Sequence, residues 1–182
     1  MIITAGIYKG RKVTAPDDKI VRPTLSKIRE SIFNTLFSMM DFGDKTFLDM
    51  FAGSGIMGLE ALSRGFGHVL ALEKNPRVAK VLKGNYENIK INPNLIIADS
   101  LTQKINEKFD VIYLDPPYFS GIYEKSLEKI KKEELLQENG IVILEHVMDV
   151  SWTDLGFELI KQKKYSGKFV TFLSLYSKVI MH

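Results

Sequence analysis

The sequence predicts an α/β fold: a mostly parallel, seven-stranded sheet with helices, closed by a C-terminal antiparallel hairpin. Three observations lead to this prediction. Short apolar runs, typical of buried strands, alternate with segments of helical periodicity from residue 47 onwards, which is the pattern of a doubly wound sheet. A glycine-rich turn joins the first of these runs to a helical segment. The last two apolar runs follow each other with no helical segment between them.

The first 40 residues are expected to form a small extension, a hairpin followed by a helix. Residues 2–13 have the apolar and glycine spacing of a short hairpin. Apolar residues then recur at helical spacing over 25–40, after Thr24 or Ser26 as a possible N-cap. Arg29 falls inside the apolar arc of this helix, where an unpaired charge would be costly. We therefore expect Arg29 either to pair with a buried carboxylate or to point into the mouth of an active site.

Residues 41–182 are expected to form the main domain, because a chain of 182 residues is ordinarily one domain with room for a small appendage. Apolar runs bounded by turn residues indicate its strands, and longer periodic segments indicate its helices. The expected strands are 47–51, 68–72, 95–98, 109–114, 141–144, 157–160 and 169–176. The expected helices are 58–64, 76–88 and 123–138.

Composition restricts the chemistry. The chain has no cysteine, and its three histidines, His68, His146 and His182, lack metal-ligand spacing, so we expect no disulfide framework and no metal site. No apolar run approaches the length of a membrane span, and the N-terminus lacks the apolar segment of a signal peptide. We therefore expect a cytoplasmic protein that does not bind membranes. We also expect a monomer, although no feature of the sequence specifies the oligomeric state.

Positive charge is concentrated in two places. Residues 1–30 hold seven Lys or Arg against three acids, a net +4, so the rest of the chain, with a total of +3, carries −1. A second basic cluster comprises Lys161, Lys163, Lys164 and Lys168. Such clusters suit a polyanionic partner, although a solvated basic face explains either of them equally well.

A cofactor site is predicted at the turn after the first strand. Gly53, Gly55 and Gly58 match the dinucleotide fingerprint G-x-G-x-x-G, and Glu73 follows Gly53 by 20 residues, placed for ribose hydroxyls. NAD is therefore one alternative. Asp49, just ahead of the glycines, would oppose a pyrophosphate but would suit the ammonium group of S-adenosylmethionine.

A third acid extends this pattern. Asp99 follows the third strand, where it could accept a hydrogen bond from an adenine amino group. Each acid alone could be an ordinary polar strand end, and Asp99-Ser100 could simply cap a helix. Together they match a cofactor with an ammonium, a ribose and an adenine. The predicted cofactor-binding residues are Asp49, Phe51, Gly53, Gly55, Glu73, Asp99 and Ser100.

Residues Asp115-Pro116-Pro117-Tyr118 directly follow the apolar run 111–114 and are the predicted catalytic residues. Ligands of open α/β sheets bind at the carboxyl ends of strands. An exocyclic amino group on a base is a poor nucleophile, which a carboxylate and a backbone carbonyl could orient by accepting its two N–H groups. The prolines hold the carbonyls in place, and the tyrosine ring can stack on the base. These features favour methylation of a base amino group.

Longer motifs then identify a family. The sequence reads ITAGIYKGRK over 3–12, RPT over 22–24, RESIFN over 29–34, LDMFAGSG over 48–55 and GLEALSRG over 58–65. With the catalytic tetrapeptide, these motifs make nearly the whole chain resemble the bacterial RsmD-type methyltransferases, which methylate guanine N2 in small-subunit (16S) ribosomal RNA. Phe66 departs from the pattern, because the family usually has a small residue there. We expect Phe66 to pack in the turn.

The resemblance implies a Rossmann-like class I methyltransferase fold, S-adenosylmethionine as the cofactor, and ribosomal RNA or an assembling small subunit as the partner. It implies that Asp115 and the Pro116 carbonyl hold the guanine amino group while Tyr118 stacks on the base. The basic N-terminal segment would bind RNA. Its candidate residues are Lys9, Arg11, Lys12, Arg22, Thr24 and Arg29.

Three rival functions stay open at this point. A DNA adenine-N6 methyltransferase uses the same tetrapeptide but usually has a target-recognition region, for which this chain has little length. An NAD-dependent oxidoreductase would explain the glycines and Glu73 but not Asp49. A non-catalytic RNA-binding module would leave the acids and the glycine loop without a role.

Overall fold

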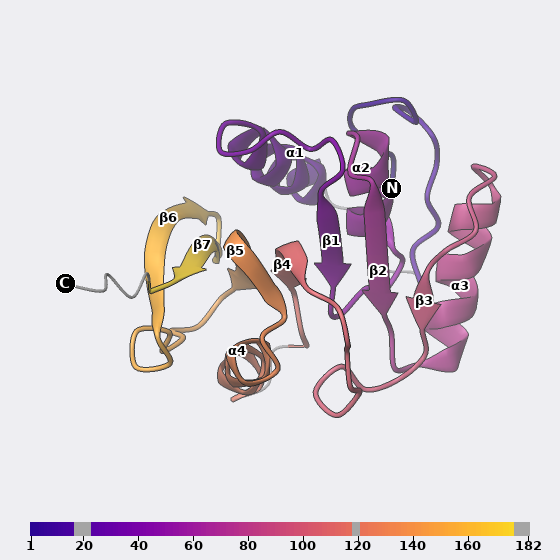
Figure 1. Cartoon of the computed structure of the whole chain (residues 1–182). Coiled ribbons are helices and arrows are strands. Elements are labelled where there is room, and N and C mark those ends of the chain that lie inside the picture. The colour runs from indigo at the N-terminus through magenta and orange to yellow at the C-terminus, as the bar shows by residue number, and fades with distance from the viewer. Residues whose placement is uncertain (17–22, 118–120, 177–182) are drawn as a thin grey trace. The chain divides into compact units, whose positions relative to one another are not determined.

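The computed structural model describes residues 1–16, 23–117 and 121–176, and side chains within the first helix from Ser26 onwards. The chain divides into two compact units, Met1–Lys104 and Ile105–His182 (Figure 1). No helix in the described part of the chain is both long and apolar enough to cross a membrane.

The first unit contains three parallel strands in the order β3-β2-β1. Its elements are α1 (Pro23–Phe37), β1 (Thr46–Asp49), α2 (Ile56–Ser63), β2 (His68–Leu72), α3 (Pro76–Glu87) and β3 (Leu95–Ile96). β1 and β2 are almost entirely buried, as expected of parallel strands covered on both faces. α3 begins where the sequence predicts, because the Asn75 side chain accepts hydrogen bonds from Arg77 N and Val78 N and Pro76 occupies the first turn.

The predicted N-terminal hairpin forms without regular strands. Ile2 and Lys12 make one isolated antiparallel bridge, supported by hydrogen bonds from Ile3 N to Arg11 O at 3.0 Å and from Gly10 N to Ile3 O at 2.9 Å. Ile3 and Val13 are buried in a core cluster of the first unit that also contains Leu59, Leu82 and Tyr86. This segment is therefore packed into the first unit.

Phe66 is buried, as expected, and joins a cluster of aromatic rings. Its ring centroid lies 4.6 Å from that of Phe42 and 5.5 Å from that of Phe47. Phe33 of α1 stacks on Phe47 of β1 at 6.0 Å. The large residue at this turn therefore helps to fix α1 against the sheet of the first unit.

The second unit contains strands in the order β4-β5-β7-β6. Its elements are β4 (Phe109–Leu114), α4 (Ile122–Lys132), β5 (Leu136–His146), β6 (Phe157–Tyr165) and β7 (Lys168–Leu175). β4 and β5 are parallel, whereas β7 runs antiparallel to both β5 and β6. The predicted C-terminal hairpin across Ser166-Gly167 is confirmed.

The prediction of a helix over 123–138 was wrong beyond Lys132. Glu134 takes a left-handed conformation, with φ 52°, which ends the helix, and Leu135 N bonds back to Ile130 O at 2.9 Å. β5 then begins at Leu136, earlier than the predicted Ile141. The polar residues that suggested a helix surface are the exposed start of this strand.

Candidate functional site

The acids of the predicted cofactor site lie at the carboxyl ends of the strands in the first unit. Asp49 ends β1, Glu73 directly follows β2, and Asp99 follows β3. Because these strands are parallel, their carboxyl ends share one edge of the sheet, where open α/β sheets bind ligands. The structure thus places all three acids on the edge that the sequence predicts.

Glu73 is linked directly to the glycine loop. One carboxylate oxygen accepts a hydrogen bond from Gly53 N at 3.0 Å, and the other accepts one from Asn75 N at 2.8 Å. The side chain is half-buried. Since each carboxylate oxygen has two lone pairs, both oxygens can accept a further hydrogen bond from a hydroxyl.

Asp49 is a buried carboxyl group, only 1% exposed. Burial raises its pKa from 3.8 to about 7; a hydrogen bond from Phe51 N at 3.3 Å lowers the pKa, and the Glu73 charge raises it. A positively charged ligand group beside Asp49 would favour the ionised carboxylate. This environment therefore suits an ammonium group rather than a phosphate.

The glycines have different structural roles. Gly53, with φ 53°, has open space where a side chain would begin, because no atom lies within 4 Å of the place that a Cβ would take. Gly55, with φ 78°, has no such room: a Cβ would lie 2.8 Å from Leu82 Cγ and 2.9 Å from Tyr86 Cε2. A Cβ on Gly58 would collide with the Tyr86 hydroxyl. Only Gly53 leaves its backbone open to a ligand, whereas the other two glycines allow close packing.

Sequence reasoning missed Tyr86, because an aromatic residue in a helix is ordinarily part of the hydrophobic core. Its hydroxyl is buried and has no hydrogen-bond partner among the described residues. Burial raises the pKa of Tyr86, and the nearby Asp49 charge adds to the effect. Tyr86 thus connects α3 to the glycine loop and to the electrostatics of Asp49.

Asp99 and Ser100 form a turn. The exposed Asp99 carboxylate accepts a hydrogen bond from Leu101 N at 2.9 Å, and its carbonyl accepts from Gln103 N at 2.9 Å. The chain then continues without a helix, so the alternative of a helix cap was wrong. Ser100 is buried, while Asp99 is available to a ligand at the sheet edge.

In the second unit, the predicted catalytic motif directly follows β4, whose observed bounds match the prediction. Asp115 is half-buried, Pro116 is buried and Pro117 is exposed. Tyr118 lies outside the described residues. The motif is therefore at the carboxyl end of a buried parallel strand, as expected.

The elements on either side of this motif are held by one residue of β5. The hydroxyl of Tyr113, near the end of β4, donates to Glu145 Oε2 at 2.7 Å. The hydroxyl of Tyr123, near the start of α4, donates to the Glu145 carbonyl at 2.7 Å. Sequence reasoning missed Glu145, whose role depends on the pairing of β4 with β5.

The candidate RNA-binding residues fall into three groups. Lys9, Arg11 and Lys12 are exposed. Arg22 lies outside the described residues, as does the side chain of Thr24 in α1. Arg29 is only 3% exposed. Of the two alternatives for Arg29, the structure shows pairing with a buried carboxylate: its Nε lies 3.2 Å from Glu60 Oε2.

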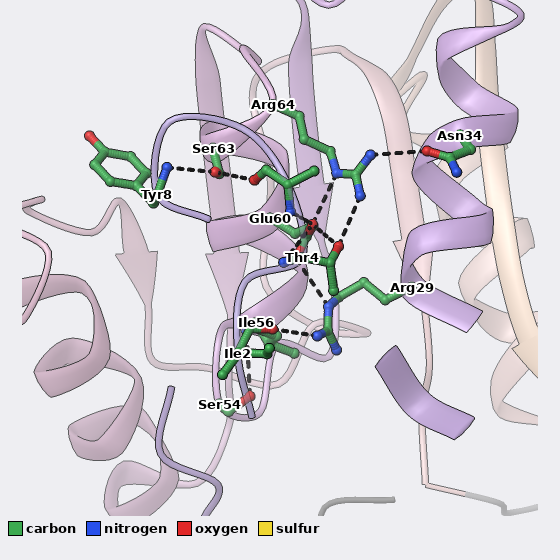
Figure 2. Close-up of polar contacts among 11 residues, drawn as sticks. Ile2, Thr4, Tyr8, Arg29, Asn34, Ser54, Ile56, Glu60, Ser63 and Arg64 are labelled. Carbon is green, nitrogen blue, oxygen red and sulfur yellow. Dashed lines mark hydrogen bonds and ion pairs between the residues drawn. The ribbon is translucent and has the colours of Figure 1, made fainter. Parts of the chain in front are cut away.

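Glu60 of α2 is the centre of this buried polar network (Figure 2). Its carboxylate accepts hydrogen bonds from Thr4 N at 2.9 Å and from Arg64 Nε at 3.0 Å. A guanidinium nitrogen of Arg29 also donates to the Ile2 carbonyl at 2.6 Å. Since α2 starts directly after the glycine loop, the network fixes the N-terminal segment to the helix that follows this loop.

Asn85 makes a second link between the N-terminal segment and the loop. Its side-chain oxygen accepts from Thr14 N at 2.8 Å, and its amide nitrogen donates to the carbonyls of Thr14 and Ser54, each at 2.9 Å. Neither Glu60 nor Asn85 was predicted, because both contacts join residues far apart in the sequence.

Comparisons with known proteins find relatives that match most of the chain. A family model described as "Conserved hypothetical protein 95" matches residues 1–174. The ribosomal RNA small subunit methyltransferase D of Haemophilus influenzae is 33% identical over 169 residues, covering 88% of this chain and 86% of that protein. The Escherichia coli protein of the same name is 30% identical over 146 residues, covering 79% and 73%.

Solved structures confirm the Rossmann-like methyltransferase fold. A candidate methylase from Haemophilus influenzae is 30% identical, with a TM-score of 0.77 over 94% of this chain and 96% of that one. A candidate methyltransferase from Escherichia coli has a TM-score of 0.82 over 98% and 99%. At 24% identity, the latter comparison speaks for the fold alone.

Proposed function

This chain belongs to the family described as conserved hypothetical protein 95, the RsmD family of methyltransferases, and on that premise we propose that it methylates guanine N2 in small-subunit (16S) ribosomal RNA with S-adenosylmethionine. The observation that carries the proposal is the buried Asp49 carboxyl at the end of β1, four residues before the open backbone of Gly53. A pyrophosphate would be repelled there once Asp49 is ionised, which disfavours an NAD enzyme. The names of the relatives, which specify ribosomal RNA, favour this substrate over DNA.

The acids at the strand ends fit S-adenosylmethionine. Asp49 would hold the ammonium group, Glu73 the ribose hydroxyls and Asp99 the adenine amino group, while the Gly53 backbone lets the ligand approach. The bound cofactor supplies a methyl group on a sulfonium, whose leaving group is a neutral thioether that needs no protonation. The protein's contribution is therefore mainly positioning and local electrostatics.

Asp115 is the proposed catalytic residue. Its carboxylate and the Pro116 carbonyl accept the two N–H groups of the guanine amino group, which aims the nitrogen lone pair at the methyl carbon. Once methylated, the nitrogen is cationic, and Asp115 takes up the proton that it releases. Tyr118 stacks on the base, which must leave its own stack to reach the site.

The N-terminal segment, residues 1–40, is the proposed RNA-binding region, and residues 41–182 form the methyltransferase domain. Lys9, Arg11 and Lys12 are exposed on a segment held in place by Glu60. Ordering this segment before RNA binds would reduce the conformational entropy lost on binding. Arg29 contributes indirectly, by holding the segment through Glu60 and Ile2.

Calorimetry tests the cofactor assignment. S-adenosylhomocysteine should bind and NADH should not. Asp99→Ala should weaken S-adenosylhomocysteine binding by about 1.5–3 kcal/mol, the range for a hydrogen bond to a charged group. Glu87→Ala, which changes an exposed acid of α3, should have no effect. Binding of NADH in place of S-adenosylhomocysteine would refute the assignment.

RNA binding is tested separately. Arg11→Ala/Lys12→Ala should lower RNA affinity and reduce its salt dependence, while cofactor affinity stays unchanged. Lys80→Ala/Lys83→Ala, two exposed lysines of α3, provide a control with the same change in charge. An equal effect of both double variants would show that only net charge matters and would refute a specific N-terminal contact.

A further inference from the structure

The tip of the β6–β7 hairpin lies at the same sheet edge as the catalytic motif, within the second unit, and Lys161 is level with Tyr113, two residues before Asp115. β4 and β5 are parallel, so Asp115 and His146 mark the same edge. In the antiparallel ladders, His146 pairs with Phe169 and Lys164 pairs with Phe169. The tip of the hairpin, residues 165–168, therefore extends to the edge where Asp115 follows β4.

Polar side chains of β4, β5, β7 and β6 lie on one face of these strands, with the buried Val170 between Glu145 and Lys163. Glu145 pairs with Val170, and Val170 pairs with Lys163; residues directly opposite share a face. Tyr113 and Lys168 join this face, because both side chains bond to Glu145, at 2.7 Å and 2.6 Å. Lys161, two residues before Lys163, lies on the same face by the alternation of a strand. These side chains thus extend from β4, next to the catalytic motif, to β6.

The opposite face of these strands packs against α4. His146, which alternates with Glu145, packs its ring against Tyr123 of α4, with centroids 6.1 Å apart. Lys164 lies on this face, with its ammonium 5.6 Å from the Phe169 ring centroid. α4 therefore covers the face that does not carry Lys161 and Lys163.

Lysines outnumber acids on this face. Lys161, Lys163 and Lys168 lie on it with two acids, Glu145 and Glu158, a net +1, and the Glu158 carboxylate accepts a hydrogen bond from the Ser174 hydroxyl at 3.2 Å. β6 is the last strand in the sheet order, and Lys161 is exposed. Burial lowers the pKa of Lys163, and the Lys161 charge lowers it further.

We propose that Lys161 and Lys163 form a second RNA-docking surface, which binds phosphates flanking the target guanine while Asp115 holds the base. The inference rests on the proposed function and adds to it a contact independent of the N-terminal segment. The lysines of this surface favour a polyanionic partner. Because the surface lies in the same unit as Asp115 and close to its sheet edge, we assign it to the RNA that supplies the base. Lys168 supports the surface through its ion pair with Glu145.

The test compares Lys161→Gln/Lys163→Gln with Lys125→Gln/Lys132→Gln, a control that removes two exposed lysines of α4. If each lysine contacts one phosphate of single-stranded RNA, the slope of log affinity against log salt should fall by about 1.4 in the first variant. It should stay unchanged in the control. Both double variants should have the S-adenosylhomocysteine affinity and the melting temperature of the wild type. If Lys161→Gln/Lys163→Gln does not fold, Lys161→Gln alone should give about half the change in slope.

If the wild type methylates the RNA and Lys161→Gln/Lys163→Gln binds the same RNA with an unchanged salt slope, the second surface is overturned and the proposed function is left intact. Unchanged affinity for naked RNA with weaker binding to assembled small subunits would also overturn it, in favour of a protein contact. A wild-type protein that transfers no methyl group to RNA would overturn the proposed function itself.

Discussion

Neutralising Asp49 is expected to change how the stability of the ligand-free protein depends on pH. Burial raises the Asp49 pKa from 3.8 to about 7 in the folded state, so between these values the folded protein holds a proton that the unfolded chain has lost. The resulting stabilisation is complete below the unfolded pKa and is lost as pH rises through the folded pKa. At about 1.4 kcal/mol per pKa unit, roughly 2 kcal/mol of unfolding free energy disappears between about pH 5.5 and pH 7.5.

Asp49→Asn keeps the shape of the side chain and removes this titration. Urea unfolding of the ligand-free protein across that pH range should show the loss of about 2 kcal/mol in the wild type but not in the variant. Asp44→Asn, which changes an exposed carboxylate of the same unit, should behave like the wild type. If Asp49→Asn has the same pH dependence as the wild type, the reasoning about the buried carboxyl is refuted.

Cofactor affinity should show the opposite trend. Ionised Asp49 attracts an ammonium group, so the wild-type affinity for S-adenosylhomocysteine should rise as pH increases through about 7. Asp49→Asn should bind more weakly and without this rise. Calorimetry at three pH values measures both effects, and a pH-independent wild-type affinity would contradict the proposed ammonium contact.

The remaining predictions concern the N-terminal network and the glycine loop. Glu60→Ala leaves the buried Arg29 charge without its carboxylate partner and should lower the unfolding free energy by about 3–5 kcal/mol; a loss below about 1 kcal/mol in urea unfolding would be inconsistent with the network. Gly55→Ala should destabilise more than Gly53→Ala, because only its Cβ meets Leu82 and Tyr86, whereas Gly53→Ala should mainly weaken S-adenosylhomocysteine binding; the reverse order would contradict the assigned roles. Tyr86→Phe removes a buried hydroxyl without a partner among the described residues and should be neutral or stabilising by about 1 kcal/mol in thermal unfolding; clear destabilisation would reveal a partner for the hydroxyl.

Sequence reasoning succeeded where local signals agree. β2 and β4 have the predicted bounds, because each is an apolar run with polar or proline residues after it. The hairpin turn at Ser166-Gly167 and the start of α3 at Pro76 are also signalled by residue type. The positions of Asp49 and Glu73 follow from those strands, since each acid ends or directly follows an apolar run.

Sequence reasoning failed where contacts between residues far apart in the sequence determine the structure. The apolar arc of α1 showed that Arg29 needs a special environment, but not that Glu60, 31 residues away, supplies it. The left-handed conformation of Glu134 has no sequence signal, so the end of α4 was misplaced. The matching glycine pattern could not reveal that Gly53 is open while Gly55 packs against Leu82 and Tyr86.

The proposed methylation of guanine N2, in which Asp115 orients the amino group, is tested most directly by identifying the methylated nucleoside. Small-subunit RNA from cells lacking the protein is incubated with labelled S-adenosylmethionine and the purified enzyme, then digested to nucleosides. The label should appear in N2-methylguanosine, and Asp115→Ala should abolish it while still binding S-adenosylhomocysteine. Label in N6-methyladenosine or transfer to duplex DNA instead of RNA would contradict the proposed substrate, and near-normal transfer by Asp115→Ala would contradict the proposed role of Asp115.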